Sequence, residues 1–186
     1  MFSVFDKKEE CCGCTACKSI CPTKAIDMNT DNEGFKYPEI NQKLCIDCGL
    51  CRKTCAFQNG YDISENFEIP DAYGVKHKNH EIRMESRSGG MFTAISDYIL
   101  ENDGVVYGVG YKNHFEVCHK RAIDRSQRDE FRGSKYVQSE LNDVFLQVRN
   151  DLLEDKWVMF TGTPCQTAGL DIYLTRTGIN KDKFIL

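Results

Sequence analysis

Eight of the eleven cysteines stand in two runs with identical spacing. The first run is Cys11, Cys14, Cys17 and Cys21, and the second is Cys45, Cys48, Cys51 and Cys55. Each reads Cys-x-x-Cys-x-x-Cys-x-x-x-Cys, and every cysteine of the second run lies 34 positions after its counterpart in the first. Closely spaced thiolates are ligands for iron–sulfur clusters or for zinc, so this repeat in strict register predicts two equivalent metal centres.

The spacing is that of bacterial ferredoxins with two [4Fe–4S] clusters, in which the fourth cysteine of each run binds the other cluster. The predicted ligand sets are therefore Cys11, Cys14, Cys17 and Cys55 for one cluster, and Cys45, Cys48, Cys51 and Cys21 for the other. The three close cysteines are expected on a tight loop, and the fourth is expected to begin a helix that leads away from it. Gly13 and Gly49 suit the unusual backbone angles of such a loop.

Zinc and disulfides are the alternatives. Structural zinc sites usually show ligands in pairs, as Cys-x-x-Cys or as histidines. Each run here has three closely spaced cysteines and a fourth further on, which is an awkward arrangement for zinc ligands. Disulfides need an oxidising compartment, and nothing in the sequence indicates export. The pattern therefore favours iron–sulfur clusters. Cys12 is off register and is interpreted as a bystander thiol, and Ala56 stands where a second proline is expected after Cys55.

The length of 186 residues fits one to two domains, and the net charge of −4 argues against a dedicated nucleic-acid binder. The N-terminus has no apolar signal region, and no later stretch approaches the roughly 18 apolar residues of a membrane span. We therefore expect a soluble, cytoplasmic protein that binds no nucleic acid and has no membrane span.

The chain is expected to have an α+β fold, in which a dicluster ferredoxin-like domain (1–60) and a linker (61–70) precede a partial α/β domain (71–186). Residues 25–28 and 34–38 are expected to pair as a hairpin. Strands are predicted at 73–75, 105–109, 115–122, 156–160 and 183–186. Helices are predicted from the periodic apolar residues around 92–99 and 141–152.

Two turns in the second domain carry chemical information. Ser88 is expected to cap the helix that follows Gly89 and Gly90, where free N–H groups attract phosphate; plain capping explains the same residues equally well. Thr161–Gln166 is expected to join a strand to another helix through a capping box of Thr163 and Gln166. Cys165 falls in the first turn, where the helix dipole favours the thiolate, and it is a candidate cluster ligand, redox thiol or flavin neighbour.

Other residues are assigned ordinary structural roles. Cys118 is expected in a strand, and His77, His80, His114 and His119 are interpreted as surface histidines. The basic residues between 121 and 135 alternate with acidic ones, as on a solvated face, although 132–135 could meet an anionic cofactor.

Three strings occur in order behind the two cysteine runs: Ser88-Gly89-Gly90, residues 132–139 (RGSKYVQS) and residues 160–166 (FTGTPCQ). Together they resemble the coenzyme F-420 hydrogenase/dehydrogenase beta-subunit family, whose bacterial members include proteins with an N-terminal ferredoxin domain. The resemblance covers essentially the whole chain and implies an iron–sulfur flavoprotein. It implies an FAD site near Ser88, Gly89, Gly90, Lys135, Gly162, Thr163 and Cys165.

The resemblance also implies a function, with an alternative. The chain is expected to be an oxidoreductase subunit that passes electrons between its clusters and a flavin or deazaflavin-type carrier, with a redox partner protein. The alternative is a ferredoxin-type delivery module with a protein-docking domain and no catalysis of its own; a divergent member that reduces a metabolite is a third hypothesis. Family members are generally longer, and the chain stops in an apolar strand at Leu186, so a fragment is expected.

Overall fold

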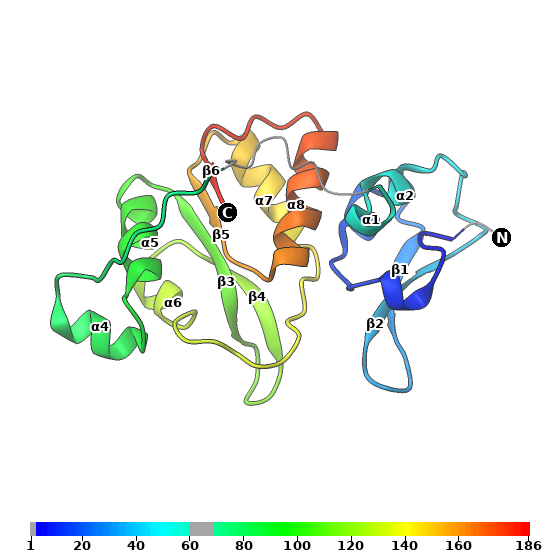
Figure 1. Ribbon diagram of the computed structural model, residues 1–186. Coiled ribbons are helices and arrows are strands. Elements are labelled where there is room, and N and C mark those ends of the chain that lie inside the picture. The colour runs from blue at the N-terminus through cyan, green and yellow to red at the C-terminus, as the bar shows by residue number, and fades with distance from the viewer. Residues whose placement is uncertain (1–2, 60–68) are drawn as a thin grey trace. The chain divides into compact units, whose positions relative to one another are not determined.

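The computed structural model describes residues 3–59 and 69–186, and its α+β architecture confirms the predicted fold class (Figure 1). The described residues form two compact units. The segment up to residue 59 belongs to one unit together with residues 141–149 and 162–181, whereas residues 69–140, 150–161 and 182–186 form the other. The predicted linker, 61–70, lies outside the described residues except for its last two positions, so the proposed domain boundaries stay predictions.

The first unit begins with short elements around a hairpin. They are η1 (Lys8–Glu10), α1 (Ala16–Ile20), β1 (Ile26–Thr30), β2 (Lys36–Ile40), α2 (Leu50–Thr54) and α3 (Ala56–Asn59). The predicted hairpin is confirmed, because β1 and β2 pair antiparallel with Ile26 opposite Ile40. Asp31 fixes the turn, since its Oδ1 accepts hydrogen bonds of 3.0 Å from the backbone N–H groups of Glu33 and Phe35. The small core is built from Val4, Ile26 and two buried cysteines, Cys17 and Cys51.

Helix α8 (Pro164–Arg176) completes the first unit, together with most of α7 (Val144–Leu153). The capping box predicted for α8 is confirmed: the hydroxyl of Thr163 and the side chain of Gln166 each bond the other residue's backbone, with Pro164 at the first helical position. The apolar periodicity predicted for α7 is also confirmed. Within this unit α8 contacts α1, α2 and α3, so a helix far along the sequence lies against the cysteine-rich segment.

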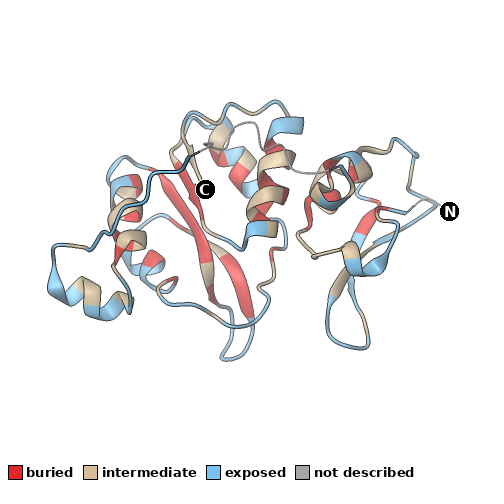
Figure 2. Ribbon diagram, in the orientation of Figure 1, coloured by how far each residue is buried: buried red, intermediate tan, exposed pale blue. Residues whose placement is uncertain are grey.

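The second unit is a mixed sheet with helices. Its elements are α4 (His80–Ser86), α5 (Met91–Glu101), β3 (Val105–Tyr111), β4 (Val117–Ala122), α6 (Arg125–Asp129), β5 (Val158–Phe160) and β6 (Phe184–Ile185). The strand order is β4-β3-β5-β6; β3 pairs antiparallel with β4, and the β3–β5 and β5–β6 pairs are parallel. Figure 2 shows the buried residues concentrated on β3, β4 and β5. Their core includes Ile99, Val106 and Met159.

Two sequence predictions for this unit are wrong. Residues 73–75 do not form a strand, because Tyr73 and Val75 are exposed and no strand pairs with this short run. Ser88 does not cap α5: the N-cap is Gly90, in the left-handed conformation (φ +79°) and without a side-chain hydrogen bond.

The histidine and arginine assignments also need correction, because His119 and Arg128 are buried. The ring of His119 stacks on Phe160 with centroids 5.1 Å apart, and its Nε2 lies 3.0 Å from the carbonyl oxygen of Thr161. The guanidinium of Arg128 donates to the carbonyl oxygen of Thr93 (3.1 Å) and to Asp97 (2.7 Å), which ties α6 to α5. Both side chains are structural.

A buried polar network joins the strands to Asp151. The hydroxyl of Tyr107 donates to Asp151 Oδ2 at 2.5 Å, and Arg121 binds both carboxylate oxygens at 2.7 Å. Burial acts to raise the pKa of Asp151, but the hydrogen bonds from Arg121 and Tyr107 outweigh it, so the pKa is lowered.

Among the described residues, none of the helices is long and apolar enough to cross a bilayer.

Candidate iron–sulfur centres

The two cysteine loops have the same backbone path. In the first loop Gly13 and Thr15 have positive φ angles (+68° and +64°), and in the second Asp47 and Gly49 do (+51° and +71°). These positions are related by the same 34-residue offset as the cysteines, so the repeat is structural as well as sequential. Left-handed residues at both gaps curl the chain around a central volume, which confirms the unusual angles predicted for Gly13 and Gly49.

A short helix follows each loop and places the last two cysteines of each run. Cys17 lies in the first turn of α1 and Cys51 in the first turn of α2, whereas Cys21 and Cys55 are the C-caps of these helices. The prediction that the fourth cysteine begins a helix is therefore wrong for Cys21. The short helix reverses the chain between the third and fourth cysteines, which separates their thiols.

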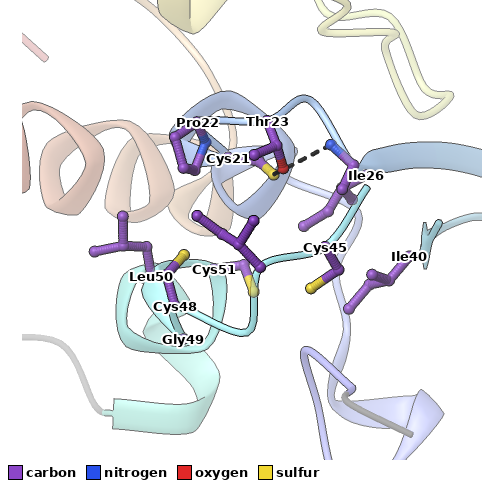
Figure 3. A pocket seen from close by; sticks show the side chains of 12 residues that line it. Cys21, Pro22, Thr23, Ile26, Ile40, Cys45, Cys48, Gly49, Leu50 and Cys51 are labelled. Carbon is purple, nitrogen blue, oxygen red and sulfur yellow. Dashed lines mark hydrogen bonds between the residues drawn. The ribbon is translucent and has the colours of Figure 1, made fainter. Parts of the chain in front are cut away.

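One pocket of the first unit brings Cys21 together with three cysteines of the second run. It is lined by Cys45, Cys48 and Cys51, and the remaining lining is mostly apolar: Pro22, Thr23, Ala25, Ile26, Ile40, Ile46, Gly49 and Leu50. Figure 3 shows Cys21 at the end of α1 across the pocket from the second loop and α2. The backbone N–H of Ala25 donates to Cys21 Sγ at 3.2 Å. Such N–H···S bonds and an apolar wall are the features that tune an iron–sulfur cluster.

The other four cysteines are coupled electrostatically. Burial is the main cause that raises the pKa of Cys17, and the nearby thiols of Cys11, Cys55 and Cys51 raise it further. Burial also raises the pKa of Cys11, with further contributions from Cys12 and Cys55. Burial is also the main cause that raises the pKa of Cys51. The neighbouring thiols that raise it further are Cys21 and Cys48, which belong to the other predicted ligand set. Crowded thiolates of this kind are stable when a metal supplies compensating positive charge.

The four cysteines of the pocket that contains Cys21 match the demands of a [4Fe–4S] cluster. In a cubane cluster each thiolate binds its own iron, so the four sulfurs surround a volume and do not converge on a point. The pocket lined by Cys21, Cys45, Cys48 and Cys51 has this arrangement, and the residues present fit a [4Fe–4S] cluster.

Helix α8 lies directly against the first cysteine loop. A Cβ atom added at Gly169 would stand 2.8 Å from Cys14 Sγ and 3.2 Å from Cys14 Cβ. Further along α8, Arg176 Nε donates to the carbonyl oxygen of Lys53 at 2.9 Å. Cys165 lies one turn before Gly169 on α8, and its Sγ stands 3.1 Å from Thr163 Oγ1.

The pKa values of Cys12 and Cys165 are shifted in opposite directions. Hydrogen bonds from Cys14, and to a lesser extent from Cys165, lower the pKa of Cys12 to about 6. Burial raises the pKa of Cys165, and the neighbouring Cys12 acts in the same direction. The prediction that the helix dipole makes Cys165 a thiolate is therefore wrong in its net effect.

The residues implied as flavin neighbours fall into both units. Gly162, Thr163 and Cys165 belong to the first unit, and Ser88, Gly89, Gly90 and Lys135 to the second. The glycine pair has a structural reason, because a Cβ at Gly89 would meet the carbonyl oxygen of Val75 at 2.7 Å and one at Gly90 would meet His77 Cβ at 2.9 Å. Lys135 Nζ donates to the carbonyl oxygens of Glu130 and Arg132 at 2.8 and 3.1 Å.

Lys135 also lines an open cavity of about 450 Å³ in the second unit. Its other lining residues are Glu85, Arg87, Tyr111, Asp129, Arg132, Gly133 and Ser134. Arg132 is paired with Asp129 (2.9 Å) and with Glu85, whereas Arg87 makes no ion pair within the part of the chain that the structure describes. The cavity thus combines the aromatic ring of Tyr111 with the cations Arg87 and Lys135, beside the carboxylates Glu85 and Asp129.

Comparison with known proteins supports the centres described above. A family model for the 4Fe-4S dicluster domain matches residues 10–59, which contain all eight cysteines of the two runs. An uncharacterized polyferredoxin-like protein of Methanocaldococcus jannaschii is 41% identical over 56 residues, which are 26% of this chain and 33% of that protein. An uncharacterized ferredoxin of the same organism is 39% identical over 46 residues, 25% of each chain. The matched segment therefore spans a third or less of these relatives. Residues 10–59 are a ferredoxin-type iron–sulfur domain with two [4Fe–4S] clusters, and its chemistry is electron transfer.

Proposed function

We propose that the chain passes electrons between its two clusters and a flavin or deazaflavin-type carrier bound by the C-terminal segment, as an oxidoreductase subunit of the coenzyme F-420 hydrogenase/dehydrogenase beta-subunit type. Cys11, Cys14, Cys17 and Cys55 hold one cluster; Cys45, Cys48, Cys51 and Cys21 hold the other. The observation that carries the proposal is the pocket in which Cys21 meets three cysteines of the second run. The clusters supply one-electron transfer, and the chain's residues position and tune them.

The exposure of the cysteines indicates which of the two clusters an external redox partner reaches. Cys48 is exposed, and the neighbouring Ile46 is 63% exposed, so an external redox partner reaches the second cluster most directly. Cys14, by contrast, lies under Gly169 of α8. The first cluster is therefore the one that lies against α8 within the first unit.

The cavity around Lys135 supports an anionic carrier in the second unit. Flavins and deazaflavins combine a flat ring system with phosphate, which matches Tyr111 beside the cations Arg87 and Lys135. The carrier would convert single electrons into two-electron chemistry. The alternative, a delivery module with a docking domain and no catalysis, predicts the clusters without any flavin.

Iron and flavin content separate the two functions. Anaerobically reconstituted protein is expected to hold about eight irons and show the brown absorption of cubane clusters. Cys55→Ser and Cys21→Ser are each expected to lose one cluster, whereas Cys118→Ala keeps both, because Cys118 lies in β4. A colourless protein that holds only zinc would refute the iron–sulfur assignment. Titration with FAD and with a deazaflavin then tests the carrier: saturable binding that Arg87→Ala weakens supports it, and no binding favours the delivery module.

A further inference from the structure

The two cysteine runs differ at one left-handed position. Thr15 and Gly49 are related by the 34-residue offset, and each is the N-cap of the short helix that follows its loop. Their backbones agree closely, with φ and ψ of 64° and 1° at Thr15 and of 71° and 3° at Gly49. Glycine adopts this conformation without strain, whereas a side chain branched at Cβ is strained there. The first run therefore carries a threonine where the backbone favours glycine.

The hydroxyl group of Thr15 is buried and unpartnered. The residue is only 7% exposed. An N-cap hydroxyl ordinarily accepts a hydrogen bond from the first turn of its helix, but Thr15 makes no such bond. Within residues 3–59 and 69–186, no donor or acceptor pairs with its Oγ1. Because a buried hydroxyl without a partner is destabilising, its burial here indicates a partner that the polypeptide does not supply.

The surroundings of Thr15 indicate what that partner is. Both of its neighbours in sequence lie under helix α8, since a Cβ atom added at Gly169 would stand 2.8 Å from Cys14 Sγ and 3.6 Å from Ala16 Cβ. Thr15 directly follows Cys14 and stands two positions before Cys17, and both cysteines are predicted ligands of the first cluster. The sulfurs of such a cluster accept hydrogen bonds. The first cluster therefore fits the place of the partner that the hydroxyl lacks.

We propose that the Thr15 hydroxyl donates a hydrogen bond to a sulfur of the first cluster and thereby raises the reduction potential of that cluster. A reduced cluster carries one more negative charge than the oxidised form, so the donated bond is stronger to the reduced state. The second cluster receives no equivalent bond, because Gly49 has no side chain. The inference rests on the first ligand set of the proposed function and adds to it a residue that sets the potential.

The test is a redox titration of the full chain, reconstituted with its clusters under anaerobic conditions and followed by electron paramagnetic resonance of the reduced clusters. Thr15→Val removes the hydroxyl and keeps the branched shape, whereas Thr15→Ser keeps the hydroxyl. In the valine variant one potential is expected to fall and the other to stay, with the iron content unchanged. Without the bond, the reduced cluster is expected to be about tenfold less favoured, which is about 59 mV for a one-electron couple. The serine variant keeps both potentials.

Thr54→Val is the matched control. It makes the same change at another buried threonine that adjoins a predicted ligand of the first cluster, Cys55. The hydroxyl of Thr54 already donates to the carbonyl oxygen of Leu50 at 2.8 Å, so its removal is expected to leave both potentials unchanged. Thr15→Ala supplies a second variant without the hydroxyl, should the valine side chain prevent folding in the left-handed conformation.

Three results would overturn the inference. If the iron-loaded Thr15→Val or Thr15→Ala protein keeps both wild-type potentials, the hydroxyl pairs with another group, such as a buried water. If Thr15→Ser shifts the potential as far as Thr15→Val does, side-chain volume is the cause and not the hydroxyl. An equal shift in Thr54→Val would assign the effect to packing. A wild-type chain that binds no iron would instead refute the proposed clusters, and its iron content shows this before any titration.

Discussion

Replacement of Gly169 by alanine tests the contact between α8 and the first cysteine loop. The new methyl group would stand 2.8 Å from Cys14 Sγ, so one of the two must move by about 0.6 Å to reach an ordinary contact of roughly 3.4 Å. Overpacking of this kind costs about 1–3 kcal/mol. A helix interior normally gains about 1 kcal/mol when glycine becomes alanine. The expected net effect is a loss of about 0–2 kcal/mol, opposite in sign to that of an uncrowded position.

The neighbouring residue, Ala168, provides a control for the effect of helix propensity alone. Ala168→Gly changes helix propensity in the opposite direction by about 1 kcal/mol without placing an atom on Cys14. Thermal unfolding of both variants, followed by helical circular dichroism and by the release of iron, separates propensity from crowding. Gly169→Ala is expected to release iron at a lower temperature than the wild type does, because the added methyl group crowds Cys14.

The reasoning would be refuted by a Gly169→Ala protein that unfolds at a higher temperature than the wild type and binds the same amount of iron. In that case α8 would not lie in contact with Cys14 in the folded protein, and the close approach that demands glycine would be absent.

Three further predictions concern the second unit, where Trp157 is the chain's single tryptophan and reports unfolding by fluorescence. Burial lowers the pKa of His119 to about 4. The free energy of unfolding is therefore expected to fall by roughly 3 kcal/mol as the pH drops from 6.5 to 4, because the unfolded chain takes up a proton that the buried ring does not. His119→Gln should remove this pH dependence. Asp151→Asn should cost about 3 kcal/mol at pH 7, and because its folded pKa is lowered, the wild-type advantage should vanish as the pH falls below about 3.9. Gly108→Ala should cost about 1–3 kcal/mol, since the added Cβ would meet the ring of Phe131 at 2.5 Å; an unchanged unfolding midpoint would contradict this packing.

The features that were predictable from the sequence are those with a local cause. The hairpin follows from its turn, the start of α8 from Thr163 and Gln166, and the two centres from cysteine spacing. Buried polar side chains were missed, because the partners that allow the burial of His119 and Arg128 lie far away in sequence. The strand predicted at 73–75 was wrong for a related reason: strand formation depends on a neighbouring strand, which a short apolar run does not reveal.

The candidate site shows the same division. Spacing within each run indicated the metal and the two ligand sets. The contact of α8 with the cysteine-rich segment was not predictable, because α8 lies far along the sequence from α1 and α2. Gly169 carried no sequence signal either: a glycine inside a helical pattern is explained only by the sulfur that approaches it.

The exchange of the fourth cysteine has a consequence for assembly. Because Cys21 of the first run lines the pocket formed by the second loop, the second run alone does not supply all four thiols of that pocket. The first iron–sulfur centre to form must draw both halves together, and it thereby prepares the second. Loading with metal is therefore expected to be cooperative when all eight cysteines are present, and the 34-residue unit, although duplicated in register, is not expected to work as two separate halves.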